Sequence, residues 1–229
     1  MHRSDLTLSS SERPTPAAGG GGVRAEEILD AATDLFAEFG YADAMTQDLA
    51  LKLQVGKGTI YRHYPSKRDL FLAAVDRVMR RMRVSIDEAV AKVDDPLLQV
   101  EVGTRAFLSF FAEHPKFVEL LILERALFRD RTTPTYMEHR ERSKLRWTGV
   151  YRTLIAQGRV RDMPVERILA VILDLAYGTI FTNYFAGSSR SPEDQARDIL
   201  DVVFHGILGD PGRGKPAAGS DGSNLGAEV

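Results

Sequence analysis

Residues 45–67 read MTQDLALKLQVGKGTIYRHYPSK. The stretch predicts two short helices, at about 46–53 and 57–63, separated by a tight turn at residues 54–56. Four apolar side chains are spaced to hold the two helices together: Leu49, Leu53, Val55 and Ile60. Because a helix of about eight residues is not stable alone, this pair needs longer helices packed around it.

The flanking segments supply longer helices. An apolar stripe at helical spacing predicts a helix over 24–40, and Gly40 is placed to stop it. Ser66 and Asp69 have capping-box spacing and start a long amphipathic helix over 67–93. A capping residue before a proline marks three further starts, at Asp95-Pro96, Thr133-Pro134 and Ser191-Pro192. The remaining helices are expected at 96–113, 116–129, 134–157, 164–186 and 192–208.

No alternating strand pattern competes with these helices, so we predict an all-α fold. A three-helix helix-turn-helix domain at 23–68 would precede a larger helical domain at 69–209. The two ends, 1–22 and 210–229, are rich in Ser, Pro, Gly and Ala and hold too little apolar surface to order themselves.

Composition narrows the class of protein. The 229 residues are 44% hydrophobic and 27% charged, as expected of a globular protein. No uninterrupted run of eighteen apolar residues and no secretory signal are present, so we expect no membrane span and a cytoplasmic location. The absence of cysteine excludes disulfides and thiolate metal sites. The net charge is only −2, but residues 44–68 carry five basic side chains and one acidic one, which makes a local basic patch.

The second short helix carries donors and aromatic side chains, which suit a nucleic-acid groove better than a core. A basic short helix is also a common solvated surface, so its composition alone leaves both readings open. A phosphate-binding loop at 56–59 is excluded, because Leu51 stands where the first glycine is required and Gly58 where Ser or Thr must follow the lysine. The five histidines lack metal-ligand spacing, and no nucleophile with a flanking base is recognisable. We therefore expect no enzyme, no metal and no cofactor.

Residues 24–72 resemble the DNA-binding domain of the TetR family, through Leu49-Ala50, the run from Val55 to Tyr64, and Ser66-Lys67 with Leu70-Phe71. The resemblance implies a set of DNA contacts at Thr46, Gln47, Lys57, Gly58, Thr59, Tyr61, Arg62, His63 and Lys67. Within this set, Gln47, Lys57, Gly58 and Thr59 would read base edges. Tyr61, His63 and Lys67 would bond phosphates and fix the register without reading sequence.

Two residues depart from the family pattern. Gln54 stands where the family has a turn glycine, so a left-handed residue is tolerated at a cost of about 1 kcal/mol or the turn differs. Gly56 replaces the usual serine cap, at a cost of a few tenths of a kcal/mol. Neither departure overturns the resemblance.

The same resemblance implies an effector pocket within 96–186. Six candidate ligand contacts, any of which could equally be core, are Phe107, Phe111, Glu124, Trp147, Tyr151 and Tyr177. Glu124 and Arg125 lie on the nearly all-apolar helix 116–129 and need partners. An ion pair with Arg105 or Arg129 is favoured over a ligand contact. The abundance of aromatic residues makes an apolar or aromatic effector plausible.

The predicted function is a homodimeric, sequence-specific DNA-binding regulator. Helices 164–186 and 192–208 would form the dimer, with Ala176, Gly178, Phe181 and Phe185 on the first and Ala196, Leu200 and Val203 on the second. The partners would be a palindromic double-stranded operator and a small-molecule effector that releases a repressor from it. The alternative is a helical architectural or adaptor protein that binds another protein through the same basic surface.

Overall fold

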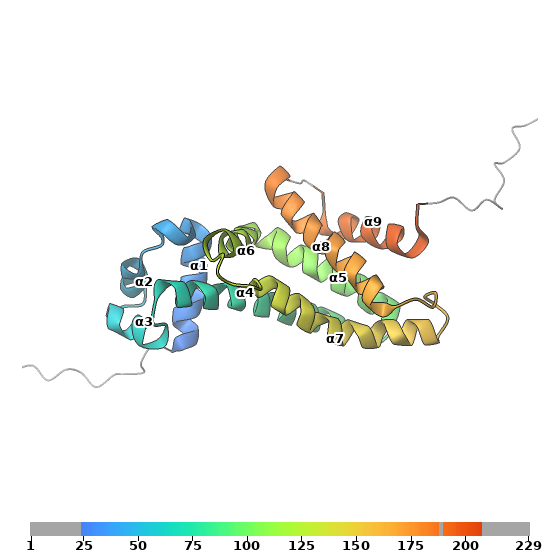
Figure 1. The fold of residues 1–229 in the computed structure, drawn as a ribbon, viewed down its shortest axis with the longest axis horizontal. Coiled ribbons are helices and arrows are strands. Elements are labelled where there is room, and N and C mark those ends of the chain that lie inside the picture. The colour runs from blue at the N-terminus through green and yellow to red at the C-terminus, as the bar shows by residue number, and fades with distance from the viewer. Residues whose placement is uncertain (1–23, 188–189, 208–229) are drawn as a thin grey trace, which may run out of the picture.

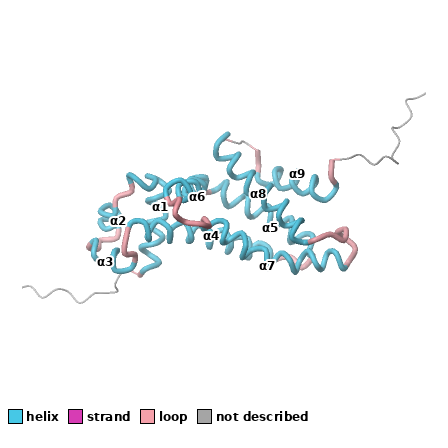
Figure 2. The backbone as a smooth tube through the Cα atoms, in the orientation of Figure 1, coloured by secondary structure: helices cyan, strands magenta, loops and turns pink. Residues whose placement is uncertain are grey.

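The computed structural model describes residues 24–187 and 190–207, and the predicted tails at 1–22 and 210–229 lie outside them. The described chain is helical without strands (Figure 2). Its nine helices are α1 (Ala25–Asp43), α2 (Thr46–Lys52), α3 (Lys57–His63), α4 (Lys67–Val90), α5 (Pro96–Glu113), α6 (Pro115–Leu127), α7 (Thr135–Ala156), α8 (Val165–Ala186) and α9 (Pro192–His205). Each predicted helix is confirmed with its ends within three residues of the expected positions.

Three predicted helix starts have the expected caps. Ser66 Oγ accepts from the backbone N–H of Asp69 at 3.1 Å, and Ser191 Oγ accepts from that of Asp194 at 3.1 Å. Asp95 accepts from the N–H of Leu98 at 2.9 Å, with Pro96 at the first helical position.

Two other helix ends differ in detail from the sequence pattern. Gly40 adopts a left-handed φ of 69° and breaks α1, but a further helical segment continues to Asp43. The expected Thr133 cap of α7 is wrong. The residue before α7 is Pro134, which has no side chain able to cap the helix, and α6 supplies the missing acceptor.

The helices form a small domain of α1–α3 and a larger domain of α5–α9, with α4 running from one into the other (Figure 1). The predicted boundary between residues 68 and 69 falls within the first turn of α4, and the buried core continues across it. Arg77 of α4 clamps α1 through Asp30, with Nε and Nη2 each 2.8 Å from a carboxylate oxygen. The first half of α4 is therefore part of the small domain.

An aromatic cluster joins the two domains. Phe71 of α4 lies 5.0 Å from Phe36 and 5.1 Å from Tyr41, between ring centroids. Phe128, directly after α6, packs on Tyr41 at 5.3 Å and on Phe71 at 5.6 Å. Edge-on aromatic pairs of this kind favour a defined geometry. The position of α6 is thus coupled by packing to the small domain.

Helix α8 is apolar on two sides. One face, with Ile168, Ile172 and Ile180, is buried in the larger domain, while Val171, Leu175 and Phe185 on another face are exposed by 48%, 39% and 72%. Its length and composition would by themselves suffice to cross a membrane. A core helix passes the same test, and the buried face of α8 belongs to the protein core.

The faces predicted for the dimer are partly used inside the chain. Ala176 is buried in the main core, and Ala196 and Leu200 of α9 are buried where α9 packs on α5. Those three residues are therefore covered within the subunit. The uncovered apolar stripe is on α8, at Val171, Leu175 and Phe185, because these positions follow each other at helical spacing on its outer side.

Candidate nucleic-acid interface and effector cavity

The turn between α2 and α3 keeps the predicted core contacts. Leu49 and Ile60 are fully buried, and Leu53 and Val55 pack against the same core. Gln54 has φ of 54° and is the one described non-glycine residue in the left-handed region. The turn therefore retains the backbone conformation that glycine favours and accepts a strained glutamine in its place.

The N-terminal end of α3 is exposed and has no side-chain cap. Gly56 is the N-cap in extended conformation and gives no side-chain hydrogen bond, as its sequence position indicated. At Gly58, exposed on the first turn, a β-carbon would meet no atom within 4 Å. Neither packing nor backbone conformation within the described chain requires glycine at position 58.

Three cations on this side of the small domain are free of acidic partners. Lys52, Lys57 and Arg62 are exposed, and within residues 24–187 and 190–207 no carboxylate oxygen lies within 4 Å of their charged nitrogens. Arg68 is different, because it pairs with Asp130 in the segment after α6. The hydrogen bond that Arg68 donates to Asp130 raises the pKa of the Arg68 guanidinium and lowers the pKa of the Asp130 carboxyl.

The remaining predicted DNA contacts lie around α3. Gln47 and His63 are exposed, Thr59 is half-buried, and Thr46 Oγ1 lies 3.0 Å from Tyr61 Oη, which ties the start of α2 to the middle of α3. A second tyrosine contact, from Tyr64 Oη to the carbonyl of Ala25 at 3.1 Å, holds the end of α3 against α1. The polar side chains of α3 are thus carried on a helix that is held in place by both neighbours.

Lys67 is already engaged within the subunit. Its Nζ donates to the carbonyl of Ala42 at 3.0 Å and lies 5.0 Å from the centroid of the Tyr41 ring. The ammonium group has three donors. Two donors therefore remain for a phosphate oxygen.

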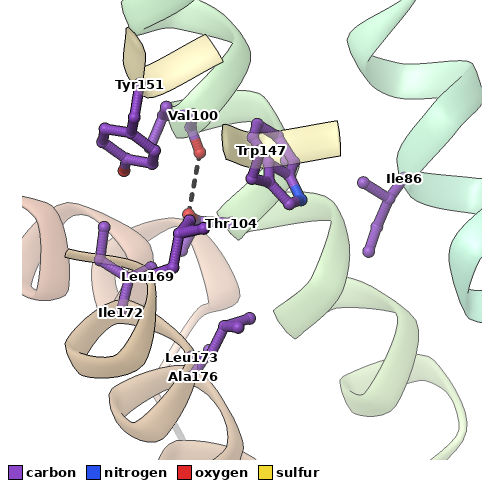
Figure 3. A pocket seen from close by; sticks show the side chains of 10 residues that line it. Ile86, Val100, Thr104, Trp147, Tyr151, Leu169, Ile172, Leu173 and Ala176 are labelled. Atoms are coloured by element: carbon purple, nitrogen blue, oxygen red, sulfur yellow. Dashed lines mark hydrogen bonds between the residues drawn. The ribbon is translucent and has the colours of Figure 1, made fainter. Parts of the chain in front are cut away.

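The larger domain contains a cavity of about 60 Å³ between α4, α5, α7 and α8 (Figure 3). Ten uncharged residues line it: Ile86, Val100, Gly103, Thr104, Trp147, Tyr151, Leu169, Ile172, Leu173 and Ala176. Of the six ligand contacts predicted from sequence, Trp147 and Tyr151 line this cavity. Gly103 was missed, although a glycine inside a predicted helix is itself a signal of close packing.

Phe107, Phe111 and Tyr177 form an adjoining aromatic cluster and are not among the residues that line the cavity. Phe107 lies 5.3 Å from Phe111 and 5.1 Å from Tyr177, between ring centroids. Burial raises the pKa of Tyr177. The cluster supports the cavity wall as part of the core.

Glu124 forms a structural ion pair, as favoured from the sequence, but its partner is neither Arg105 nor Arg129. It is 1% exposed, and its carboxylate accepts from the backbone N–H of Thr135 at 3.0 Å and from its hydroxyl at 2.8 Å. Its cationic partner is Arg131, 3.2 Å away, in place of Arg105 or Arg129. Arg125 donates to the carbonyl of Arg131. Glu124 therefore caps α7 from α6, away from the cavity, because the proline before α7 leaves that helix without a cap of its own.

A buried polar contact joins α7 to α4. His139 is 2% exposed, and its Nε2 lies 2.7 Å from Oδ1 of Asp76, which also faces Arg80. Since α7 carries both His139 and the cavity residue Trp147, the cavity wall is mechanically tied to α4 close to the small domain.

Comparison with known proteins finds similarity to one family in the N-terminal part of the chain. A family model described as "Bacterial regulatory proteins, tetR family" matches residues 28–74. YhgD of Bacillus subtilis, an uncharacterized HTH-type transcriptional regulator, is 44% identical over 68 residues, or 29% of this chain and 35% of YhgD. The HTH-type transcriptional regulator EthR of Mycolicibacterium smegmatis is 27% identical over 157 residues, or 68% of this chain and 69% of EthR.

The fold as a whole is also similar to solved structures. FadR of Bacillus subtilis, a transcriptional regulator solved in complex with stearoyl-CoA, matches with a TM-score of 0.66 at 17% identity, covering 81% of this chain and 100% of FadR. The chain spans only about a third of YhgD. The family model matches the helix-turn-helix domain, and the similarity to FadR concerns the fold.

Proposed function

We propose that this chain is a transcriptional regulator of the TetR family, whose family model matches residues 28–74, and that it binds operator DNA through α3. The observation that carries the proposal is the exposed surface of α3, whose cations have no acidic partners in the described chain. Lys57 and Arg62 are exposed without acidic partners, and Gly58 between them has no internal role. A helix of this kind can enter a major groove closely, with cations free to meet phosphates or base edges.

The proposed binding unit is a homodimer. One seven-residue recognition helix covers too few base pairs, so two copies must stand about 34–36 Å apart to meet successive major grooves. Support comes from the exposed apolar stripe of α8 at Val171, Leu175 and Phe185. Large apolar side chains exposed along one side of a helix are characteristic of an interface between subunits. A palindromic operator is the counterpart of such a dimer.

We further propose that a small molecule in the cavity releases the protein from DNA, which makes it a repressor. The cavity is walled by Ile86 of α4 and Trp147 of α7, and α7 is joined to α4 through His139 and Asp76. A ligand with different affinities for two positions of α7 would shift α4 and, with it, the separation of the two recognition helices.

The alternative is an adaptor that binds an acidic protein through the same cations. Selection from a pool of random duplexes separates the two, because a regulator enriches one palindromic sequence. Lys57→Ala should change the enriched sequence or lower the slope of log K against log salt by about 0.9 for each phosphate that the variant no longer neutralises. Lys92→Ala, beyond the far end of α4, is the matched control and should leave both unchanged. Failure of the wild-type protein to enrich any sequence would overturn the proposal.

A further inference from the structure

The lining of the cavity restricts the charge of what can bind there. All ten lining residues are uncharged, and eight of them offer only carbon atoms or an indole. Moving an ionised group into such a site without a partner is strongly unfavourable. The cavity therefore selects a neutral, mainly apolar molecule, and this inference rests on the proposed effector role of the same site.

One buried polar atom in the lining has no partner. Tyr151 is 1% exposed, and its hydroxyl makes no hydrogen bond to any described part of the chain. Figure 3 shows its ring beside Val100, with the hydroxyl toward the side of Leu169 and Ile172. Burial raises the pKa of Tyr151, so the phenol stays protonated and able to donate at neutral pH. An unpaired buried hydroxyl is rare in proteins because it has lost its hydrogen bonds to water without replacing them.

The second polar group in the lining is already satisfied. Thr104 Oγ1 donates to the carbonyl of Val100 at 2.8 Å, the bond drawn in Figure 3. Its single proton is used within α5, so Thr104 cannot also donate to a ligand. Tyr151 is thus the one lining hydroxyl whose proton is unassigned within the described chain.

Trp147 limits the size of the cavity. Its indole lies against Gly103, where a β-carbon would sit 2.5 Å from the Trp147 Cη2 atom. Glycine at position 103 therefore lets the indole occupy space beside α5. The indole is half-buried, in contrast to the enclosed Tyr151 ring, so it is the large lining group that can move toward solvent. About 60 Å³ holds only a few water molecules, and a larger ligand needs this movement.

We propose that the cavity binds an uncharged, mainly apolar small molecule with one hydrogen-bond acceptor, which accepts the Tyr151 proton while the Trp147 indole moves aside and packs on the apolar body. The proposal explains three observations together: an unpaired buried hydroxyl, an otherwise apolar wall and a glycine that makes room for an indole.

Three probes of matched size test the proposal: cyclohexyl methyl ketone, isopropylcyclohexane and cyclohexanecarboxylate. Trp147 is the only tryptophan of the chain, so its fluorescence reports binding at this site directly. The ketone should perturb the fluorescence, the carboxylate should not, and Tyr151→Phe should weaken ketone binding about fivefold while changing hydrocarbon binding less than twofold. Thr153→Val, which removes an exposed α7 hydroxyl that already donates to the carbonyl of Gly149 and does not line the cavity, should leave ketone binding unchanged.

The controls keep the outcomes distinct. Tyr151→Phe removes an unpaired hydroxyl, so its melting temperature should equal or exceed that of the wild type. Equal weakening of ketone and hydrocarbon binding, or no weakening of either, would overturn the role of Tyr151, and binding of the carboxylate would overturn the restriction to neutral ligands. Absence of any fluorescence response would overturn the cavity as a ligand site. In each case, selection of an operator by the wild-type protein would show that the DNA-binding function still stands.

Discussion

Replacing Gly58 by alanine should separate protein stability from DNA binding. Within the subunit the added methyl meets nothing within 4 Å, and Gly58 has no left-handed φ. Glycine in a helix is less favourable than alanine by about 0.5–1 kcal/mol, and position 58 is in the first turn, so a gain of about 0.5 kcal/mol is expected. For a chain of this size, that gain raises the melting temperature by about 1–2 °C.

The same methyl should weaken operator binding. If the backbone of α3 approaches the base edges at Gly58, the methyl holds the helix away from them, and removing one good hydrogen-bonded base pairing costs about 1–3 kcal/mol in each half-site. For a dimer this means at least a tenfold drop in affinity, measured by fluorescence anisotropy on the selected operator at fixed salt.

Gly149→Ala is the control for this experiment. Gly149 lies on the exposed side of α7, where a β-carbon again meets nothing within 4 Å. The substitution should stabilise the protein by up to about 1 kcal/mol and leave operator binding unchanged. Unaltered operator affinity in a stabilised Gly58→Ala protein would refute the close approach of α3 to DNA.

Three other perturbations test separate parts of the structure. Gln54→Gly should raise the free energy of unfolding by about 0.5 kcal/mol, because relief of the left-handed strain exceeds the added entropy of the unfolded chain. Gln157→Gly, at a right-handed position after α7, should lower the free energy of unfolding instead. If both glycine variants change the unfolding free energy in urea titrations by the same amount, position 54 is not strained. Leu175→Asp should yield monomers at micromolar concentration in sedimentation velocity. The control, Leu145→Asp at a position 83% exposed on α7, should remain a dimer. If both variants are dimers, the interface lies elsewhere. Glu124→Ala should lower the free energy of unfolding by about 2–3 kcal/mol, because it leaves the buried N–H and hydroxyl of Thr135 without their acceptor. A decrease below about 0.5 kcal/mol would contradict the capping role.

The sequence by itself determined the helices and their order. Apolar spacing, prolines at helix starts and capping residues such as Ser66 and Ser191 are local signals, and local signals survive without knowledge of packing. The helix-turn-helix segment could also be predicted from the sequence, because the motif is short and the spacing of its residues is specific. The strain at Gln54 could be anticipated for the same reason, since the turn geometry sets the φ of that position whatever its side chain.

Tertiary structure alone decided the partners of side chains that are distant in sequence. Glu124 was expected near Arg105 or Arg129, but the chain after α6 brings Arg131 and the uncapped start of α7 to it instead. The aromatic residues of the larger domain looked alike in sequence, yet Tyr151 lines a cavity with its hydroxyl unpaired while Tyr177 packs in the neighbouring cluster.

The apolar residues of α8 and α9 illustrate the same division. Their period predicted two faces, but whether a face is covered depends on the angle at which α5 crosses them, and this angle comes from packing among all the helices. Ala196 and Leu200 are therefore buried within the subunit, while Leu175 and Phe185 stay exposed. Periodicity determines which residues share a face of a helix, and only the assembled fold determines what that face meets.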